Sequence, residues 1–175
     1  MADFEIIAEG TLSTGASSIT LTSIPQTYTH LEFQISARGS YASAYPGSSQ
    51  MRFNSDSGSN YGGHDGYVSS GTGGAEGYSL NALTQTYYSN ALALDSWTAN
   101  IQGFSSWIIP NYTSTSFAKQ VYRTASVTDA SSIYTLRFGS SAWDNTAAIT
   151  QIELLEPSAG TEFMAQSSYW LAGWA

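Results

Sequence analysis

The sequence predicts an all-β protein, an antiparallel β-sandwich or jelly roll built as a single domain over residues 1–175. Three observations favour this fold class. Roughly eight to ten short segments alternate apolar and polar residues, as half-buried antiparallel strands do. Glycine, proline, asparagine and serine separate these segments at short intervals. No long segment repeats apolar residues at the helical spacing, and no fixed repeat of the solenoid or propeller kind is present.

The N-terminal part predicts three strands. Residues 4–9 form the first, which we expect at a sheet edge or against a neighbouring subunit, and residues 1–10 are a candidate N-terminal arm. Residues 17–38 predict two strands joined by a link at Pro25, which has no N–H to donate to a ladder. In the second of these strands one face carries Leu31, Phe33, Ile35 and Ala37. The period of two places these residues in the core.

The middle of the chain combines one short strand with long connections. Residues 50–54 predict a strand with Met51 and Phe53 directed inward. Residues 55–77 are rich in glycine and serine and predict a long loop, which in a compact domain has a functional use or is ordered by a partner. Residues 78–99 are compatible with short helical turns and with strands, so their structure stays open at this point.

The C-terminal half predicts a further series of strands separated by turns. The expected strands are residues 106–109, 117–128, 133–138, 149–155 and 163–170, with turns at 139–146 and 156–160. In the second of these the odd-numbered residues from Phe117 to Val127 share one face. The chain ends on large apolar residues, from Tyr169 to Ala175, which we expect either in the last core strand or docked on a neighbour.

The charge composition excludes several classes of partner. Charged residues make up 10% of the chain, and five Lys and Arg residues face thirteen Asp and Glu residues, for a net charge of −8. So few cations cannot replace the counterions of a nucleic acid, and an acidic chain is not drawn to an anionic membrane surface. No apolar run is long enough to span a membrane. A surface with few charges suits close contact with another protein, because little charge has to be desolvated.

The sequence contains neither cysteine nor a recognisable secretory signal. The chain has no cysteine, which excludes disulfides and a thiolate metal site. The N-terminal residues lack the basic and apolar segments of a secretory signal, so we expect synthesis in the cytoplasm.

The glycine-rich segment offers a weak metal site. Asp56, Asn60 and Asp65 are closely spaced oxygen ligands of the type that calcium prefers. The complete pattern of an EF-hand loop is missing, and the same residues are the usual components of tight turns. No nucleophile elbow and no carboxylate pair of fixed separation is present. We therefore expect no enzymatic activity, no cofactor and no metal, with these three residues as the weak alternative.

Aromatic residues gather in or near the predicted loops. Tyr41, Tyr45, Tyr61 and Tyr67 belong to this set. Aromatic rings beside Asn and Asp side chains are typical of carbohydrate-binding surfaces, but they are also enriched at subunit interfaces and in cores. The sequence favours an interface or the core over a sugar site. Together with the apolar residues of the N-terminal arm, the candidate interface residues are Phe4, Ile6, Ile7, Tyr41, Tyr45, Tyr61 and Tyr67.

Several segments resemble a group of small β-rich virion proteins of tailed bacteriophages. The similar segments are SITLTSIPQTYTHLEFQISAR, which ends at Arg38, and MRFNSDSGSNYGGH, residues 51–64. AAITQIELLEP, residues 147–157, and FMAQSSYWLAGWA, residues 163–175, occupy the places of the closing elements of that group. The resemblance spans most of the chain except about residues 68–110. It implies a structural component of a phage particle that is made in the host cytoplasm.

Within that resemblance, the expected role is a capsid decoration or cement protein, which acts by surface complementarity and not by chemistry. Its partners would be capsid or tail subunits and further copies of itself in a symmetric oligomer. The alternative is a tail-fibre or receptor-binding module that recognises bacterial surface polysaccharide. The two differ in whether the aromatic residues meet another protein or a glycan.

Overall fold

The computed structural model describes residues 4–42, 46–70, 75–86, 92–128, 134–156 and 161–175. These residues form strands, turns and bends but no helix. The strands are β1 Glu5–Thr11, β2 Ser18–Leu21, β3 His30–Gly39, β4 Gln50–Phe53, β5 Tyr61–Ser69, β6 Ala75–Leu83, β7 Ala93–Leu94, β8 Gly103–Pro110, β9 Lys119–Thr128, β10 Tyr134–Trp143, β11 Ile152–Leu155 and β12 Ser168–Trp174.

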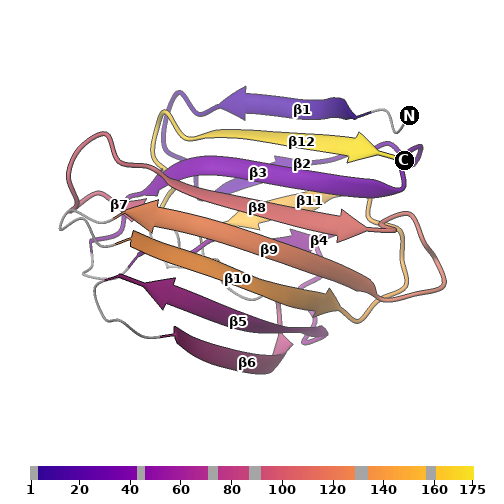
Figure 1. Cartoon of the computed structure of the whole chain (residues 1–175). Helices are drawn as coiled ribbons and strands as arrows, with labels where there is room; N and C mark the ends of the chain where they lie inside the picture. The colour runs from indigo at the N-terminus through magenta and orange to yellow at the C-terminus, as the bar shows by residue number, and fades with distance from the viewer. Residues whose placement is uncertain (1–3, 43–45, 71–74, 87–91, 129–133, 157–160) are drawn as a thin grey trace.

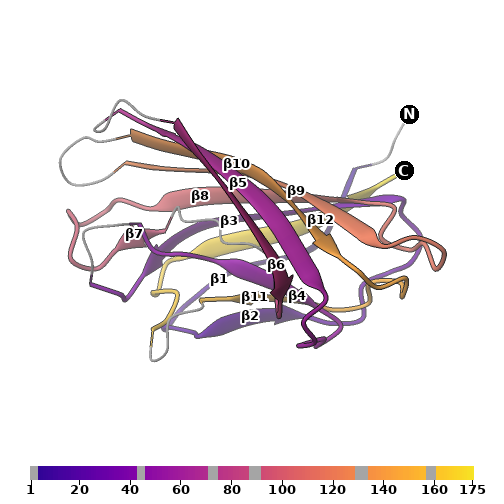
Figure 2. The same ribbon diagram turned by 90° about the horizontal axis from the view of Figure 1, so that it is seen from below.

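The strands form two sheets of very different width. The large sheet has the order β1-β12-β3-β8-β9-β10-β5-β6, with the short β7 paired to β3, and the small sheet has the order β2-β11-β4. Except for the parallel β3–β7 pair, neighbouring strands are antiparallel. Figure 1 shows the large sheet in front of the small one, and Figure 2 shows the two layers from the side. The predicted antiparallel β-sandwich is confirmed, whereas a jelly roll is not.

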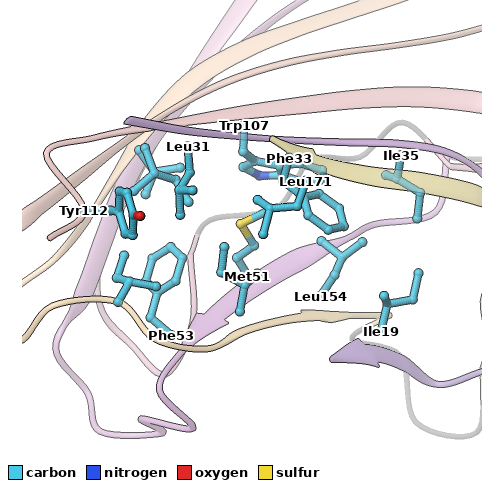
Figure 3. Packing of buried hydrophobic residues seen from close by; sticks show 14 of the residues in the cluster. Ile19, Leu31, Phe33, Ile35, Met51, Phe53, Trp107, Tyr112, Leu154 and Leu171 are labelled. Atoms are coloured by element: carbon cyan, nitrogen blue, oxygen red, sulfur yellow. The ribbon is translucent and has the colours of Figure 1, made fainter. Parts of the chain in front are cut away.

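The core lies between the two sheets. The inward residues of β3 are Leu31, Phe33, Ile35 and Ala37, and each is at most 1% exposed. They meet Ile19, Met51 and Leu154 from the three strands of the small sheet (Figure 3). Trp107 of β8 and Leu171 of β12 extend this cluster along the large sheet. The alternation predicted from the sequence therefore sets the core side of β3 correctly.

The two strands predicted in residues 17–38 do not pair with each other. β2 belongs to the small sheet and β3 to the large one, so the link that contains Pro25 crosses from one layer to the other. Gln26 holds this crossing in place, because its side-chain amide donates to the backbone carbonyls of Ile24 and Ile149, both at 2.9 Å. Alternation within each strand was predicted correctly, but it carries no information about which sheet a strand joins.

Two predicted connections are strands in the structure. The expected loop over residues 55–77 contains β5 and the start of β6, because Tyr61 to Ser69 pair along β10. The expected turn at 139–146 starts too early, since β10 continues through Trp143. Pairing on both sides supplies the hydrogen bonds that the glycine-rich local sequence does not favour by itself. Of residues 78–99, the described part holds the end of β6 and the short β7, and residues 87–91 lie outside it.

The N-terminal segment forms an edge strand of the large sheet, and the C-terminal segment forms a strand inside it. β1 is the edge strand predicted for residues 4–9, and it pairs with β12 with a register shift between Ile6 and Ala8. This segment therefore lies on the chain's own sheet and is not a free arm. β12 lies between β1 and β3 and buries Leu171 and Ala172 completely, as expected for a last core strand. In the segment 117–128 the odd-numbered residues share one face from Lys119 onward, as predicted, and this face is buried, but Phe117 precedes β9 and is 73% exposed.

Candidate functional site

The large sheet carries an uncovered apolar surface on the side away from the small sheet. Large apolar residues there are between 39% and 63% exposed, and the strand registers place them side by side on β8, β9, β10 and β5. We call this surface the apolar face, and its members are Phe104, Ile108, Tyr122, Tyr134, Leu136, Phe138 and Val68. Figure 1 looks onto it, and among the described strands none lies over it in Figure 2.

The orientation of β10 creates most of this face. Its apolar residues Tyr134, Leu136 and Phe138 point outward, while Thr135 and Arg137 between them point to the inner side. The register with β9 imposes this, because Leu136 lies opposite Ser126 and Arg137 lies opposite the buried Ala125. An ordinary half-buried strand would turn its apolar residues inward. β10 therefore presents its apolar side to the outside.

The apolar face is ridged. The β10 residues form the ridge, and the neighbouring outward residues of β9, Thr124, Ser126 and Thr128, are small. A hollow of about 570 Å³ lies beside this ridge, lined by Phe104 of β8, Ser126 of β9, Tyr134 and Leu136 of β10 and, beyond β10, Val68 of β5. On the other side of Phe138 a second hollow of about 780 Å³ lies beside Gly66 and Gly77, where no side chain fills the surface.

Charge is confined to the border of the apolar face. Among the described residues, the outward positions of β8, β9, β10 and β5 hold no Asp, Glu, Lys or Arg. Glu32 on the adjacent β3 marks the border, opposite Ile108. Its carboxylate accepts hydrogen bonds from Gln34 Nε2 at 2.6 Å and Ser106 Oγ at 3.0 Å. The chain has a net charge of −8, so its acidic residues lie elsewhere and this surface does not depend on charge to bind a partner.

The inner side of the same strands holds a buried ion-pair cluster. Asp65 of β5 accepts hydrogen bonds from the guanidinium groups of Arg123 on β9 and Arg137 on β10, the latter at 2.5 Å. The side chains of Asp65, Arg123 and Arg137 are 0%, 2% and 12% exposed. The Arg137 guanidinium also lies 4.7 Å from the ring centroid of Tyr67. This cluster, and not an apolar core, holds Arg137 on the inner side of β10.

Gly139 leaves the space in which the Arg123 side chain reaches Asp65. It lies on β10 directly between Arg123 and Asp65 on the flanking strands. A Cβ at this position would lie 2.3 Å from the backbone oxygen of His64 and 2.8 Å from a guanidinium nitrogen of Arg123. Glycine is therefore required for Arg123 to reach across β10 to Asp65.

Asp56 organises the turn between β4 and β5. Its carboxylate accepts hydrogen bonds from Gly58 N at 2.9 Å, from Asn60 Nδ2 at 2.8 Å and from Trp143 Nε1 at 2.8 Å. These donors favour the charged form and lower the pKa of Asp56 from 3.8 to about 2. The turn is thereby tied to the end of β10.

The three weak metal candidates do not converge on one site. Asp56 and Asn60 hydrogen-bond to each other, whereas Asp65 is held by two arginines in the ion-pair cluster. In the part of the chain that the structure describes, no group of three His, Cys, Asp or Glu residues is close enough to hold a metal ion. The lone pairs of Asp56 already receive N–H donors, as expected for a structural turn.

The predicted interface residues divide into exposed and buried ones. Phe4 and Ile6 are 56% and 44% exposed, and Phe4 lies against Trp170 at a centroid distance of 5.7 Å. Ile7 is partly buried and packs against the core, so it contributes to holding β1 on the sheet. Phe4 and Ile6 thus form a smaller exposed apolar site at the β1 edge.

The predicted aromatic loops do not form one platform. Tyr61 is 1% exposed and stacks with Trp143 in the core, so its assignment to an interface is wrong. Tyr67 lies on β5 beneath the Arg137 guanidinium, and Tyr41, just beyond β3, is 43% exposed. Tyr45 lies outside the described residues. Burial of Tyr61 follows from its position opposite Trp143 in the β5–β10 ladder, which local sequence does not reveal.

The residues of the apolar face were not predicted from the sequence. The signal was present in residues 133–138, where large apolar residues alternate with Thr135 and Arg137. The alternation predicts a strand with one apolar side, but not that this side points away from the core. The register with β9 and β5 decides that, and it involves residues far away in the sequence.

Comparisons with known proteins reveal no family. No family model and no curated protein sequence matches the chain. A weak likeness joins it to the exoplasmic/lumenal domain of VIP36 in its Ca²⁺/Man3GlcNAc-bound form, with 10% identity over 90% of this chain and 84% of that one, and a TM-score of 0.23. Another joins it to the D2–D3 domains of the flagellar cap protein FliD from Escherichia coli, with 8% identity over 98% of both chains and a TM-score of 0.15. Likenesses of this size support no conclusion about function.

Over the described residues, no helix has the length and apolar character needed to cross a membrane.

Proposed function

We propose that the chain is a structural protein of a tailed-phage virion, and specifically a capsid decoration protein that acts through protein–protein contacts. The observation that carries this proposal is the outward orientation of β10. Leu136 and Phe138 are each 50% exposed on a sheet whose other side already holds a complete core. Uncovered apolar surfaces of this extent mark sites of contact with other molecules.

The chemistry of the surface favours a protein as the partner. The apolar face carries aromatic and aliphatic side chains without Asp, Glu, Lys or Arg at its described outward positions. Depletion of charge together with enrichment of Tyr and Phe is the composition of an interface core. The resemblance of four sequence segments to phage virion proteins suggests which assembly provides the partners. Phe4 and Ile6 at the β1 edge would supply a second contact to a neighbouring virion subunit.

Localisation on the particle tests the proposal. Intact phage of the kind that encodes the chain would be labelled with gold-tagged antibody against it and viewed by electron microscopy. We expect label over the head. Label confined to the tail tip or fibres would replace the decoration role by receptor binding. Particles without label, together with absence of the chain from purified virions by mass spectrometry, would refute a virion role altogether.

A further inference from the structure

We propose that the apolar face binds a second copy of this chain, face to face about a twofold axis. This inference deepens the proposed function and rests on it only in taking protein contact as the role of this surface. It states that a second copy of the chain covers the face, whereas the proposed function states only that the chain belongs to a virion. Three observations point to a second copy: the size of the face, its lack of charge and its shape.

The size of the face matches one half of a stable dimer interface. Its seven large side chains are 39–63% exposed. An aromatic side chain presents about 150–250 Å² and an aliphatic one less, so the seven together expose roughly 600 Å². A standard interface buries about 800 Å² on each partner, and the small residues between the large ones make up most of the difference. The largest apolar patch on a typical monomer is about 300–600 Å², so this face lies at the upper limit of what an isolated chain usually leaves in water.

The lack of charge favours an identical partner. Two acidic chains repel each other wherever their charged surfaces meet, and each copy carries a net charge of −8. The apolar face is the part of the described large sheet where two copies can meet without bringing Asp or Glu together, since Glu32 lies only at its border. A partner recognised by charge would need complementary side chains on this face, and the described outward positions supply none.

The shape of the face is complementary to itself. The β10 ridge of Tyr134, Leu136 and Phe138 stands out beside the hollow of about 570 Å³ that reaches from Phe104 to Val68, so the face carries both a ridge and a groove. A twofold axis places the ridge of each copy against the groove of the other, so one contact occurs twice. Such isologous contacts close after two copies and do not propagate into fibres. Facing sheets would then pack about 10 Å apart, as in other sheet-on-sheet contacts.

Sedimentation equilibrium of the full chain tests the inference. We expect a mass of twice the 18.7 kDa of the chain at about 100 µM, and reversible dissociation on dilution. Leu136→Glu puts a charge in the centre of the face and should weaken dimerisation at least about 100-fold. The matched control is Phe117→Glu, which replaces an apolar residue that is 73% exposed outside the face. It should leave the dimer unchanged.

Each alternative result has a defined meaning. A wild-type chain that remains monomeric at about 100 µM, or a Leu136→Glu variant that still dimerises, would overturn the inference. Larger concentration-dependent oligomers would overturn the closed twofold arrangement. Circular dichroism and the melting temperature would show that Leu136→Glu is folded, as expected for a half-exposed position. A monomer found on phage heads would refute only this inference, whereas a dimer absent from virions would refute only the proposed function.

Discussion

β3 and β10 are strands of equal length in the same sheet, but they use the same alternating pattern in opposite ways. In β3 the apolar residues point to the core and the polar residues point outward. In β10 Tyr134, Leu136 and Phe138 point outward, and Arg137 points inward to Asp65. A buried ion-pair cluster thus replaces apolar packing beneath Leu136 and Phe138, whereas Trp143 at the end of β10 belongs to the apolar core. The comparison separates a strand that stabilises the fold from one that exposes a surface for contact.

Phe33→Ala in β3 should have the largest effect on stability. Phe33 is fully buried, with its ring centroid 5.9 Å from that of Trp107 and 6.2 Å from that of Tyr169. Truncation leaves a cavity between the sheets and should cost about 3–5 kcal/mol. Urea unfolding followed by circular dichroism gives the value. A loss below about 1 kcal/mol would mean that this part of the core is not packed as described.

Asp65→Asn tests the cluster that replaces an apolar core beneath β10. The substitution leaves the buried guanidinium groups of Arg123 and Arg137 without their shared carboxylate, and should cost about 3 kcal/mol. The control is Glu153→Gln, which breaks the ion pair with Arg52. The side chains of Arg52 and Glu153 are 23% and 21% exposed. That change should cost less than about 1 kcal/mol. Equal losses in the two variants would contradict the distinction between the buried and the partly exposed pair.

Asp56→Asn should make stability less dependent on acid pH. The folded-state pKa of Asp56 is about 2, below the ordinary 3.8, so its contribution is complete above about pH 4 and disappears as pH falls through 2. The lowered pKa corresponds to at most about 2 kcal/mol, and water around this partly exposed carboxylate screens the interactions and reduces the contribution to about 1 kcal/mol. Unfolding free energies of wild type and variant should therefore differ by about that amount at pH 6 and converge near pH 2. A constant difference between pH 6 and pH 2 would show that the charge of Asp56 does not matter.

Gly139→Ala examines why the arginine can cross β10. The added methyl group would contact His64 O at 2.3 Å, so a loss of about 1–3 kcal/mol is expected. Gly77→Ala on β6 is the matched control, because its nearest neighbour, Asp65 O, would lie 3.8 Å away. Thermal unfolding of both variants measures the contrast. If Gly139→Ala is as stable as Gly77→Ala, the close approach across β10 is not a constraint.

The sequence predicts the strands better than it predicts their sides and partners. β3 was predicted with its inward face because Leu31 and Phe33 alternate with polar residues and the core lies where alternation implies. For β10 the same reasoning finds the strand, but its apolar side faces outward, since the partners of Asp65 lie 58 and 72 residues further along the chain. Asp65 itself stood out as a weak metal ligand, because a lone carboxylate in a glycine-rich segment does not reveal which cations surround it.

The smallest effect on the folding of a single chain is expected for Phe138→Ala, the counterpart of Phe33→Ala on the apolar face. Phe138 is 50% exposed, so at a protein concentration below the dimer dissociation constant its loss should change the unfolding free energy by less than about 1 kcal/mol. At about 100 µM the dimer should add stability to wild type, because association favours only the folded chain, and the variant should lose this addition. Unfolding curves at both concentrations separate the stability of the single chain from the stability that dimerisation adds. A Phe138→Ala effect that is as large at low concentration as that of Phe33→Ala would show that β10 serves the core of its own chain and not a partner.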